Sequence, residues 1–360
     1  KEDFAFVEDT RSAFHIMGPL IRTPKGLSYF QFEKFASYLD KALARGYALV
    51  DEVLECSRTV GEQQDGRSSF VGRLAAAGEM TDTEIKEATG SFLLAAVDTT
   101  SNTLNWVLVH LANNPDIQAR LYEEVSSVLK DTENNDFCKK KLAQMPFLKA
   151  CVRESFRLSP GIQWIERQTQ RDMVLNGFQI PAGTRIMLNW DVCYQNEGLF
   201  TEGSSNGDGE EHPASEFRPE RFMPAAIEER KRTFKSVLDN KIVSKPFSFG
   251  PRMCPGSRVA ETEIYSLVCG IVQDWEFSLK DVTPKTPHGN PGPAWEAQEV
   301  LMTRADPFPK FVFERRGGAV VEPTMRSSGG GSSNNQNSGA MGHMPTMMTT
   351  GGGSSKNQNR

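Results

Sequence analysis

The sequence predicts a mainly α-helical fold with a small β region, and three observations carry this prediction. Apolar residues recur with helical spacing through most of residues 4–160. Short segments bounded by turn residues follow between residues 161 and 189, as expected for strands. A further amphipathic helix is expected from about Ser257 to Trp275, directly after a glycine-rich loop that holds one cysteine.

The composition limits the class of protein. The chain has 360 residues and a formal net charge of −5, so it has no overall basic field and nucleic acid is not expected as a partner. Its six cysteines form no C-x-x-C pair, which argues against a zinc module and a disulfide scaffold. Residues 1–316 are expected to fold as one domain, whereas residues 317–360 are rich in Gly, Ser, Asn, Gln and Met and are expected to form a disordered tail.

The longest predicted helix begins at a capping box. Thr81 precedes Glu84 by three residues, and the next proline is Pro115, which allows a helix of about 45 Å. Its middle joins an apolar run at residues 92–97, typical of a helix buried all round, to the polar run Asp98–Thr103. These polar side chains predict a water-holding bend, because a hydroxyl that bonds to the carbonyl four residues earlier can open a helix.

Two further helices are predicted over residues 115–130 and 145–160. In the second, Glu154 and Arg157 are three residues apart and Lys149 and Arg153 are four apart, so each pair lies on one face. Exposed charged pairs of this kind contribute little to stability. By spacing alone, Glu154 and Arg157 are better interpreted as a surface pair, whereas Lys149 and Arg153 are equally well interpreted as a solvated pair or as a functional one.

The C-terminal half is expected to supply the strands. Asn176-Gly177 predicts a hairpin over residues 174–180, and further strands are expected at Thr184–Asn189 and Phe311–Arg315. Charged surface loops are expected at residues 131–140, 201–216 and 228–245.

The segment Phe247–Gly256 has the clearest chemistry. Cys254 lies between two glycines, and Arg252 precedes it by two residues. Glycine lets the backbone turn tightly and approach a flat ligand, thiolate sulfur is a preferred ligand of iron, and arginine is a fixed cation that can bind a carboxylate. We therefore expect Cys254 to bind a metal. The alternative is an ordinary buried thiol in a turn.

The pattern Phe-x-x-Gly-x-Arg-x-Cys-x-Gly in this segment resembles the haem-binding signature of the cytochrome P-450 superfamily. The resemblance implies a haem b cofactor with Cys254 as the metal ligand, since a cysteine thiolate on haem iron favours O–O cleavage. It implies that Arg252 and Arg167 meet the haem propionates and that Phe247 screens the sulfur from water. The remaining cofactor contacts that it implies are Gly250 and Gly256.

The polar centre of the long helix resembles the oxygen-activation helix of the same superfamily. The resemblance implies that Thr99 supports the activation of dioxygen and that Asp98 connects it to solvent through water. The alternative is a polar seam between helices. Because the family often has glycine where this chain has Ala96, we expect a narrower groove. The residues implied to line the substrate side are Ala95, Ala96, Ile162, Ile165 and Met302.

Two further resemblances concern charged residues. Phe217–Phe222 resembles the superfamily's arginine segment, which implies that Arg221 joins Glu154 and Arg157 in a buried ion triad that holds the cysteine loop. Residues 148–154 look like the mitochondrial clan, in which basic residues meet an acidic ferredoxin. The residues implied to dock this redox partner are Lys149, Arg153 and Arg258.

The likeness extends over residues 1–316 and implies the C-terminal two thirds of a cytochrome P-450 fold. The chain opens without a start methionine, so we expect a leader and the N-terminal helices and strands to be missing. No apolar run reaches the ~18 residues of a membrane span. The likeness to the mitochondrial clan implies a membrane-associated protein with peripheral membrane contact, with the mitochondrial inner membrane favoured over the endoplasmic reticulum.

The function that the resemblance implies is monooxygenation. One oxygen atom of dioxygen would enter a lipophilic substrate such as a sterol, with electrons from a ferredoxin-type or reductase donor. One alternative is a haem-thiolate isomerase or dehydratase that uses a peroxide. Another is a truncated chain that cannot hold haem.

Overall fold

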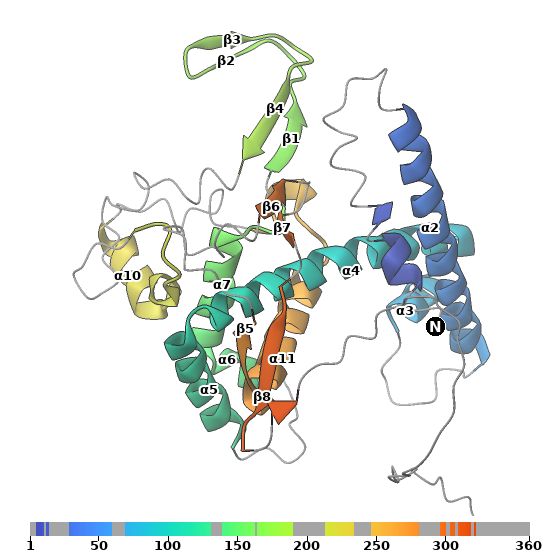
Figure 1. Ribbon diagram of the computed structural model, residues 1–360. Coiled ribbons are helices and arrows are strands. Elements are labelled where there is room, and N and C mark those ends of the chain that lie inside the picture. The colour runs from blue at the N-terminus through green and yellow to red at the C-terminus, as the bar shows by residue number, and fades with distance from the viewer. Residues whose placement is uncertain are drawn as a thin grey trace, which may run out of the picture. The chain divides into compact units, whose positions relative to one another are not determined.

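A computed structural model describes most of the region that the sequence predicts to be globular. The described residues are 5–10, 12–13, 29–59, 69–130, 139–162, 164–189, 213–233, 246–280, 296–299, 303–306, 309–317 and 320–321. All of them belong to the unit formed by Lys1–Glu322. This unit is mainly helical with small sheets, which confirms the predicted fold class (Figure 1).

Helices make up most of the described chain. Five of them correspond to predicted helices: α2, α4, α5, α7 and α11. The bounds of the helices, including two short 3-10 helices, are α2 (Tyr29–Thr59), α3 (Phe70–Ala77), α4 (Asp82–Ala112), α5 (Pro115–Leu129), α6 (Lys139–Ala143), α7 (Pro146–Leu158), η3 (Pro219–Phe222), α10 (Pro224–Thr233), η4 (Gly250–Arg252) and α11 (Ser257–Asp274).

The strands form small antiparallel sheets, with β1 paired to β4, β2 to β3, β6 to β7, and β8 between β5 and β9. Asn176 and Gly177 both have positive φ (49° and 85°), as the tight hairpin between β2 and β3 requires. The bounds of the strands are β1 (Trp164–Gln168), β2 (Met173–Leu175), β3 (Phe178–Ile180), β4 (Arg185–Asn189), β5 (Trp275–Leu279), β6 (Glu296–Glu299), β7 (Thr303–Asp306), β8 (Phe311–Arg315) and β9 (Val320–Val321).

The long helix α4 is the element that most of the others contact. It begins at the predicted capping box, in which Glu84 N donates to Thr81 Oγ1 (3.3 Å) and Thr81 N donates to Glu84 Oε2 (2.8 Å). Thr81 N and Thr81 Oγ1 both donate to Glu84 Oε2 (2.8 Å each), and these two hydrogen bonds lower the pKa of Glu84. α2 crosses α4 closely at Gly90, where a Cβ would lie 2.6 Å from the ring of Tyr47. Helices α3, α5, α7 and α11 also contact α4 (Figure 1).

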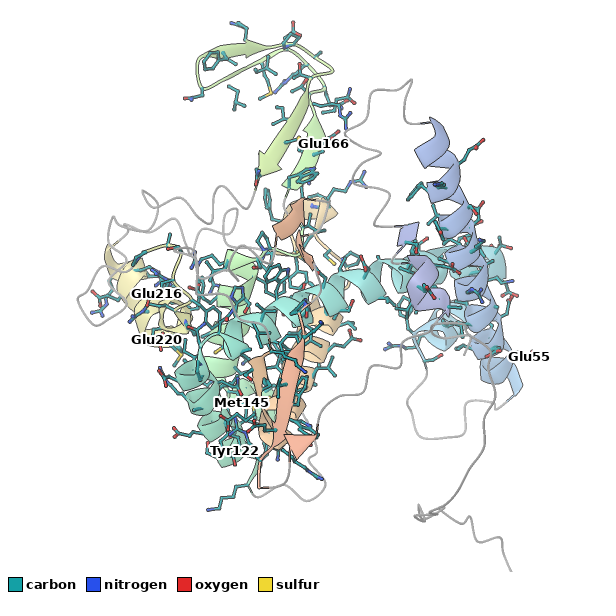
Figure 2. All side chains as sticks on the ribbon, viewed as in Figure 1. Glu55, Tyr122, Met145, Glu166, Glu216 and Glu220 are labelled. Carbon is teal, nitrogen blue, oxygen red and sulfur yellow. The ribbon has the colours of Figure 1, made fainter. Side chains whose placement is uncertain are left out.

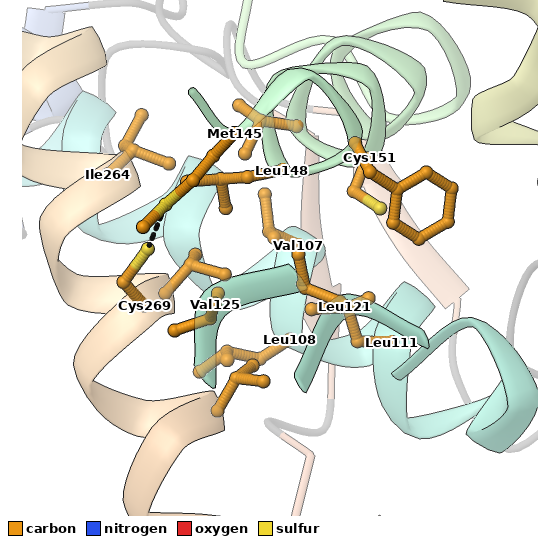
Figure 3. Close-up of a cluster of buried hydrophobic side chains, with 14 of the residues drawn as sticks. Val107, Leu108, Leu111, Leu121, Val125, Met145, Leu148, Cys151, Ile264 and Cys269 are labelled. Atoms are coloured by element: carbon orange, nitrogen blue, oxygen red, sulfur yellow. Dashed lines mark hydrogen bonds between the residues drawn. The ribbon is translucent and has the colours of Figure 1, made fainter. Parts of the chain in front are cut away.

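The main hydrophobic core lies between α4, α5, α7, α11 and β5, and Figure 3 shows its centre. The sulfur atoms of Cys269 and Met145 are 3.5 Å apart in this core. A smaller core joins α2, α3 and the start of α4 through Val50, Leu54, Val71 and Ile85. The core residues labelled in Figure 3 are Val107, Leu108, Leu111, Leu121, Val125, Met145, Leu148, Cys151, Ile264 and Cys269.

A carboxylate from α5 caps the start of α7. The N-cap residue Met145 makes no side-chain cap, but the two oxygens of Glu124 accept hydrogen bonds from Phe147 N (2.9 Å) and Leu148 N (2.8 Å). A negative charge at a helix N-terminus is favourable because unpaired N–H groups and the helix dipole meet there. Glu124 therefore fixes the helix that carries Glu154 and Arg157.

Three segments differ from the sequence-based expectation. Residues 228–233 are helical in α10, because Pro224 starts a run of good helix formers. The expected loop at 131–140 ends in helix α6, which begins at Lys139. Strand β9 lies beyond the expected domain end at residue 316, where the β-branched Val320 and Val321 pair with β8. Residues 131–138, 190–212, 234–245 and Met302 lie outside the described residues.

Among the residues that the structure describes, no helix combines the length and the apolar character needed to cross a membrane.

Candidate functional site

The predicted metal-binding cysteine lies on a short loop closed by backbone hydrogen bonds. Cys254 N donates to Phe247 O (3.0 Å) and Met253 N to Gly250 O (3.0 Å), and α11 begins three residues after Cys254. Gly250 has φ +72°, a conformation that favours glycine. The Cys254 thiol is exposed. The interpretation of Cys254 as an ordinary buried thiol is therefore wrong.

Two other cysteines show what a structural thiol looks like in this chain. Cys151 and Cys269 are buried in the main core. Burial raises the pKa of Cys269 to about 12 and also raises the pKa of Cys151, and the Glu124 carboxylate adds to both shifts. These two sulfur atoms remain protonated thiols, whereas a metal ligand must be a thiolate.

The surroundings of Cys254 fit a haem. A Cβ on Gly256 would lie 3.9 Å from Cys254 Sγ, an ordinary contact distance, so Gly256 lies directly beside the sulfur. Phe247 packs edge-on against Phe156 of α7, with ring centroids 5.4 Å apart, and this contact anchors the loop to the main core. An exposed cysteine thiol on an anchored, glycine-flanked loop has the soft-donor chemistry that would suit haem iron.

The middle of α4 combines a buried acid with hydroxyls that bond along the helix. Asp98 is buried and Thr99 is half-buried. Thr99 Oγ1 donates to Ala95 O (2.9 Å), and Thr103 Oγ1 donates to Thr99 O (2.9 Å). These are the hydroxyl-to-carbonyl bonds expected from the sequence, and they occur within an uninterrupted α-helix (Figure 1).

The apolar run in front of Asp98 is more exposed than expected. Phe92, Ala95 and Ala96 are exposed, so the prediction that this part of α4 is buried all round is wrong. Together with Thr99 they follow the i, i+3, i+4, i+7 spacing of one helix face. Helical periodicity identifies such a face but does not tell whether protein or ligand covers it.

The connection between α7 and β1 lies against α4. Ser159 Oγ is 3.1 Å from His110 Nε2 of α4, and a Cβ on Gly161 would lie 3.0 Å from Thr103 Oγ1. The absence of a side chain at Gly161 therefore allows this segment to approach α4 one turn beyond Thr99. Ile162, a predicted substrate contact, comes next and is 37 % exposed.

Strand β1 places Ile165 and Arg167 on one face. The register pairs Ile165 with Leu188 and Arg167 with Ile186 of β4, so these two β4 residues share that face. Ile186 and Leu188 are not among the residues predicted to line the substrate side. Arg167 is exposed and donates from Nη1 to Glu166 O (2.8 Å). Arg252, the other predicted propionate ligand, is also exposed.

Glu154, Arg157 and Arg221 are brought together, with each side chain at most 2 % exposed. Arg157 binds the carboxylate in a bidentate manner, Nε to Oε2 (2.7 Å) and Nη2 to Oε1 (2.8 Å). Arg221 Nε lies 3.5 Å from Glu154 Oε1. Arg218 N adds a backbone hydrogen bond to Oε1 (2.9 Å). Burial lowers the pKa of Arg221, and the Glu154 carboxylate acts in the opposite direction.

The sequence suggests no role for His110, a buried residue of α4. His110 is fully buried and stacks on Phe217, with centroids 5.0 Å and planes 6° apart. Burial, with the positive charge of Arg157, lowers the pKa of His110 to about 3. The imidazole is therefore neutral at physiological pH. Its partner Ser159 lies 49 residues away, so no local pattern could indicate the contact.

The predicted docking residues lie on α7 and α11. Lys149 is half-buried, and the guanidinium of Arg153 lies 4.3 Å from the centroid of the Phe222 ring. Burial raises the pKa of Tyr265 on α11, with Glu261 adding to the shift and Arg153 opposing it. Arg258 is exposed in the first turn of α11. The three cations therefore belong to two helices that contact each other.

A mainly helical chain that presents an exposed cysteine at the start of one helix, next to a long helix with a buried acid, has the features of a haem-thiolate protein. The family model described as cytochrome P-450 matches residues 13–303. The chain therefore belongs to the cytochrome P-450 family, and the resemblance found in the sequence is confirmed.

Several curated proteins are similar to this chain. The mitochondrial 1,25-dihydroxyvitamin D(3) 24-hydroxylase of Rattus norvegicus is 34 % identical over 222 residues, which are 62 % of this chain and 38 % of the relative. The mitochondrial sterol 26-hydroxylase of the same species is 35 % identical over 201 residues, 54 % of this chain and 34 % of the relative. Cytochrome P-450 10 of Lymnaea stagnalis is 29 % identical over 285 residues, 78 % of this chain and 48 % of the relative. The chain spans about a third to a half of the length of these relatives.

Proposed function

We propose that this protein is a haem-thiolate monooxygenase that inserts one oxygen atom of dioxygen into a lipophilic, sterol-like substrate. The observation that carries the proposal is the exposed Cys254 thiol on a loop that backbone hydrogen bonds and Phe247 anchor at the start of α11. Membership of the cytochrome P-450 family supports a haem cofactor, and we propose haem b. The sterol-like substrate is suggested by two relatives whose names describe hydroxylases of vitamin D and sterol.

The residues around Cys254 would hold the cofactor. Cys254 would supply the thiolate ligand, Gly256 would lie beside the sulfur, and Phe247 would limit access of water to it. Arg252 and Arg167 are exposed cations that would bind the two propionates. The bound haem would supply dioxygen binding and O–O cleavage, and the protein would orient the substrate and deliver protons.

Asp98 and Thr99 would deliver those protons. The single proton of the Thr99 hydroxyl is donated to Ala95 O, which leaves its oxygen lone pairs able to accept a hydrogen bond from a water molecule. Asp98 is buried directly before Thr99, where a carboxyl group can exchange protons with solvent through water while the reaction centre stays dry. The exposed Ala95 and Ala96, together with Ile162 and Ile165, would line the substrate side.

Replacing Thr99 tests this assignment. We expect Thr99→Ala to bind haem normally but to lower the product formed per NADPH oxidised severalfold, because proton delivery becomes uncoupled from electron delivery. The matched control is Thr100→Ala, the adjacent threonine, which should retain the coupling. Oxygen uptake, NADPH oxidation and product are measured together with a ferredoxin and its reductase. Equal coupling in wild type and Thr99→Ala would refute the role of Thr99, and turnover with a peroxide alone would favour an isomerase or dehydratase.

We further propose a ferredoxin-type electron donor and a location at the mitochondrial inner membrane with peripheral membrane contact. Lys149, Arg153 and Arg258 would meet an acidic partner, since complementary charge suits a fast and transient encounter. The named mitochondrial relatives support the location. The packing of Arg153 on Phe222 suggests that Lys149 and Arg258 carry more of the contact than Arg153.

A further inference from the structure

Residues 159–162 follow α7 and lie against α4 before the chain enters β1. Ser159 is buried, and its N donates to Ser155 O (2.8 Å) as the C-cap of α7. A Cβ on Gly161 would lie 3.0 Å from Thr103 Oγ1, so the backbone itself approaches α4 here. Ile162 comes next and is exposed. The position of Ile162 therefore depends on what holds this segment against α4.

A histidine of α4 reaches the segment. His110 Nε2 is 3.1 Å from Ser159 Oγ, and His110 is fully buried. Burial lowers the pKa of His110 to about 3, so the imidazole is neutral, with one nitrogen that donates and one that accepts. A hydroxyl can do either, so the bond to Ser159 forms with both tautomers. His110 Nδ1 has no hydrogen-bond partner among the described residues, so within them the ring bonds through Nε2.

Aromatic neighbours fix the plane of the imidazole. Phe217 stacks on it with planes 6° apart, and Trp106, four residues earlier on α4, lies with its centroid 6.0 Å away. Phe217 is itself anchored, because Arg157 Nη2 donates to the carbonyl oxygen of the preceding residue, Glu216 (3.2 Å), which Figure 2 labels. A ring that is packed on its face points Nε2 in one direction, so its hydrogen bond constrains where the serine lies.

We propose that His110 is a positioning residue for the substrate side of the site, which holds residues 159–162 against α4 through Ser159 and so fixes the place of Ile162. An apolar ring would fill the same space, whereas a buried polar pair is costly to separate and favours one arrangement of the segment over others. The inference rests on the proposed function in one respect, the assignment of Ile162 to the substrate side. Because His110 is fully buried, it would act through this segment and not by touching the substrate.

Amide hydrogen exchange of the full chain tests the first step and needs no haem. We expect His110→Phe and Ser159→Ala to speed exchange at residues 159–165 about tenfold relative to α11, because the bond that closes this segment on α4 is lost. His110→Gln, whose side-chain amide reaches the position of Nε2, should restore slow exchange. The matched control is Gln118→Leu, which removes buried hydrogen bonds to Phe277 N (3.0 Å) and Phe277 O (2.9 Å) and should leave residues 159–165 unchanged.

Azole binding to the haem-loaded chain tests the second step. Imidazole reports access to the iron, whereas clotrimazole is an imidazole that also carries bulky aromatic rings into the substrate side. We expect His110→Phe and Ser159→Ala to raise the Kd of clotrimazole about fivefold and to leave the Kd of imidazole unchanged, because only the bulky ligand meets Ile162. Both constants are read from the absorption shift of the haem. A purely structural role of His110 would change both constants together, and Gln118→Leu should change neither.

The contrary outcomes are distinct. Unchanged exchange at residues 159–165 in His110→Phe would overturn the proposal, as would equal changes for the two azoles. Equal acceleration by Gln118→Leu would also overturn it, because the effect would then be a general loss of stability. A wild-type chain that takes up no haem would contradict the proposed function and with it the substrate role of Ile162, while hydrogen exchange would still decide whether His110 holds the segment.

Discussion

Replacing Glu154 by glutamine should destabilise the protein by about 3–5 kcal/mol, because it leaves buried positive charge without compensation. In the structure Glu154 accepts two hydrogen bonds from Arg157 and one from Arg218 N, and it lies 3.5 Å from Arg221 Nε. Glutamine removes the negative charge and turns an amide donor toward these donors. The loss is a large part of the 5–15 kcal/mol that is typical of a folded domain, and it corresponds to a lower Tm by about 10 °C.

The assay is urea unfolding of wild type and variant, followed by circular dichroism. The matched control is Glu166→Gln, which breaks an equally close pair with Arg185 on the surface, where side chains are 35 % and 61 % exposed. This control should leave the midpoint almost unchanged, because water screens and replaces the lost contact. The reasoning is refuted if Glu154→Gln is no more destabilising than Glu166→Gln.

Two further predictions concern His110 and the docking surface. The unfolded chain protonates His110 below an ordinary pKa of about 6.5, whereas the folded chain does so only near the lowered pKa of about 3. Between pH 6.5 and pH 3 the unfolded state therefore binds more protons than the folded state, so the free energy of unfolding falls as the pH falls. His110 alone should lower the free energy of unfolding by about 2 kcal/mol between pH 7 and pH 5. His110→Phe should lack that part of the loss in urea unfolding at the two pH values, and an identical loss in both proteins would argue against a neutral buried imidazole. Lys149→Glu should raise the Kd for a ferredoxin about fivefold at low salt, and less at high salt, because charge attraction is screened. Lys231→Glu on α10, 63 % exposed, is the charge-matched control, and equal effects of the two variants would contradict the docking assignment.

Local signals in the sequence predicted much of the fold. The capping box at Thr81 starts α4, and Asn176-Gly177 forms the hairpin turn, because both depend on residues within three positions of one another. The cysteine loop was identified for the same reason, since its glycines and its ligand form one continuous segment.

Contacts between distant segments could not be predicted in this way. The cap that Glu124 provides for α7, the contact of His110 with Ser159, and the approach of Gly161 to Thr103 all join residues far apart in the chain. Phe92, Ala95 and Ala96 were expected to be buried but are exposed. Helical periodicity identifies which residues share a face, but it does not tell whether another part of the protein covers that face. The buried triad of Glu154, Arg157 and Arg221 could be predicted only from the family resemblance, because a charged pair three residues apart on a helix usually lies on the surface.

The most direct test of the central proposal is the carbon monoxide difference spectrum of the reduced, haem-loaded chain. The proposal predicts the spectrum of thiolate-ligated haem in the wild type and its loss in Cys254→Ala, while Cys269→Ala, which removes a buried core thiol, keeps it. A Cys254→Ala protein that retains the thiolate spectrum would contradict the assignment of Cys254 as the haem ligand.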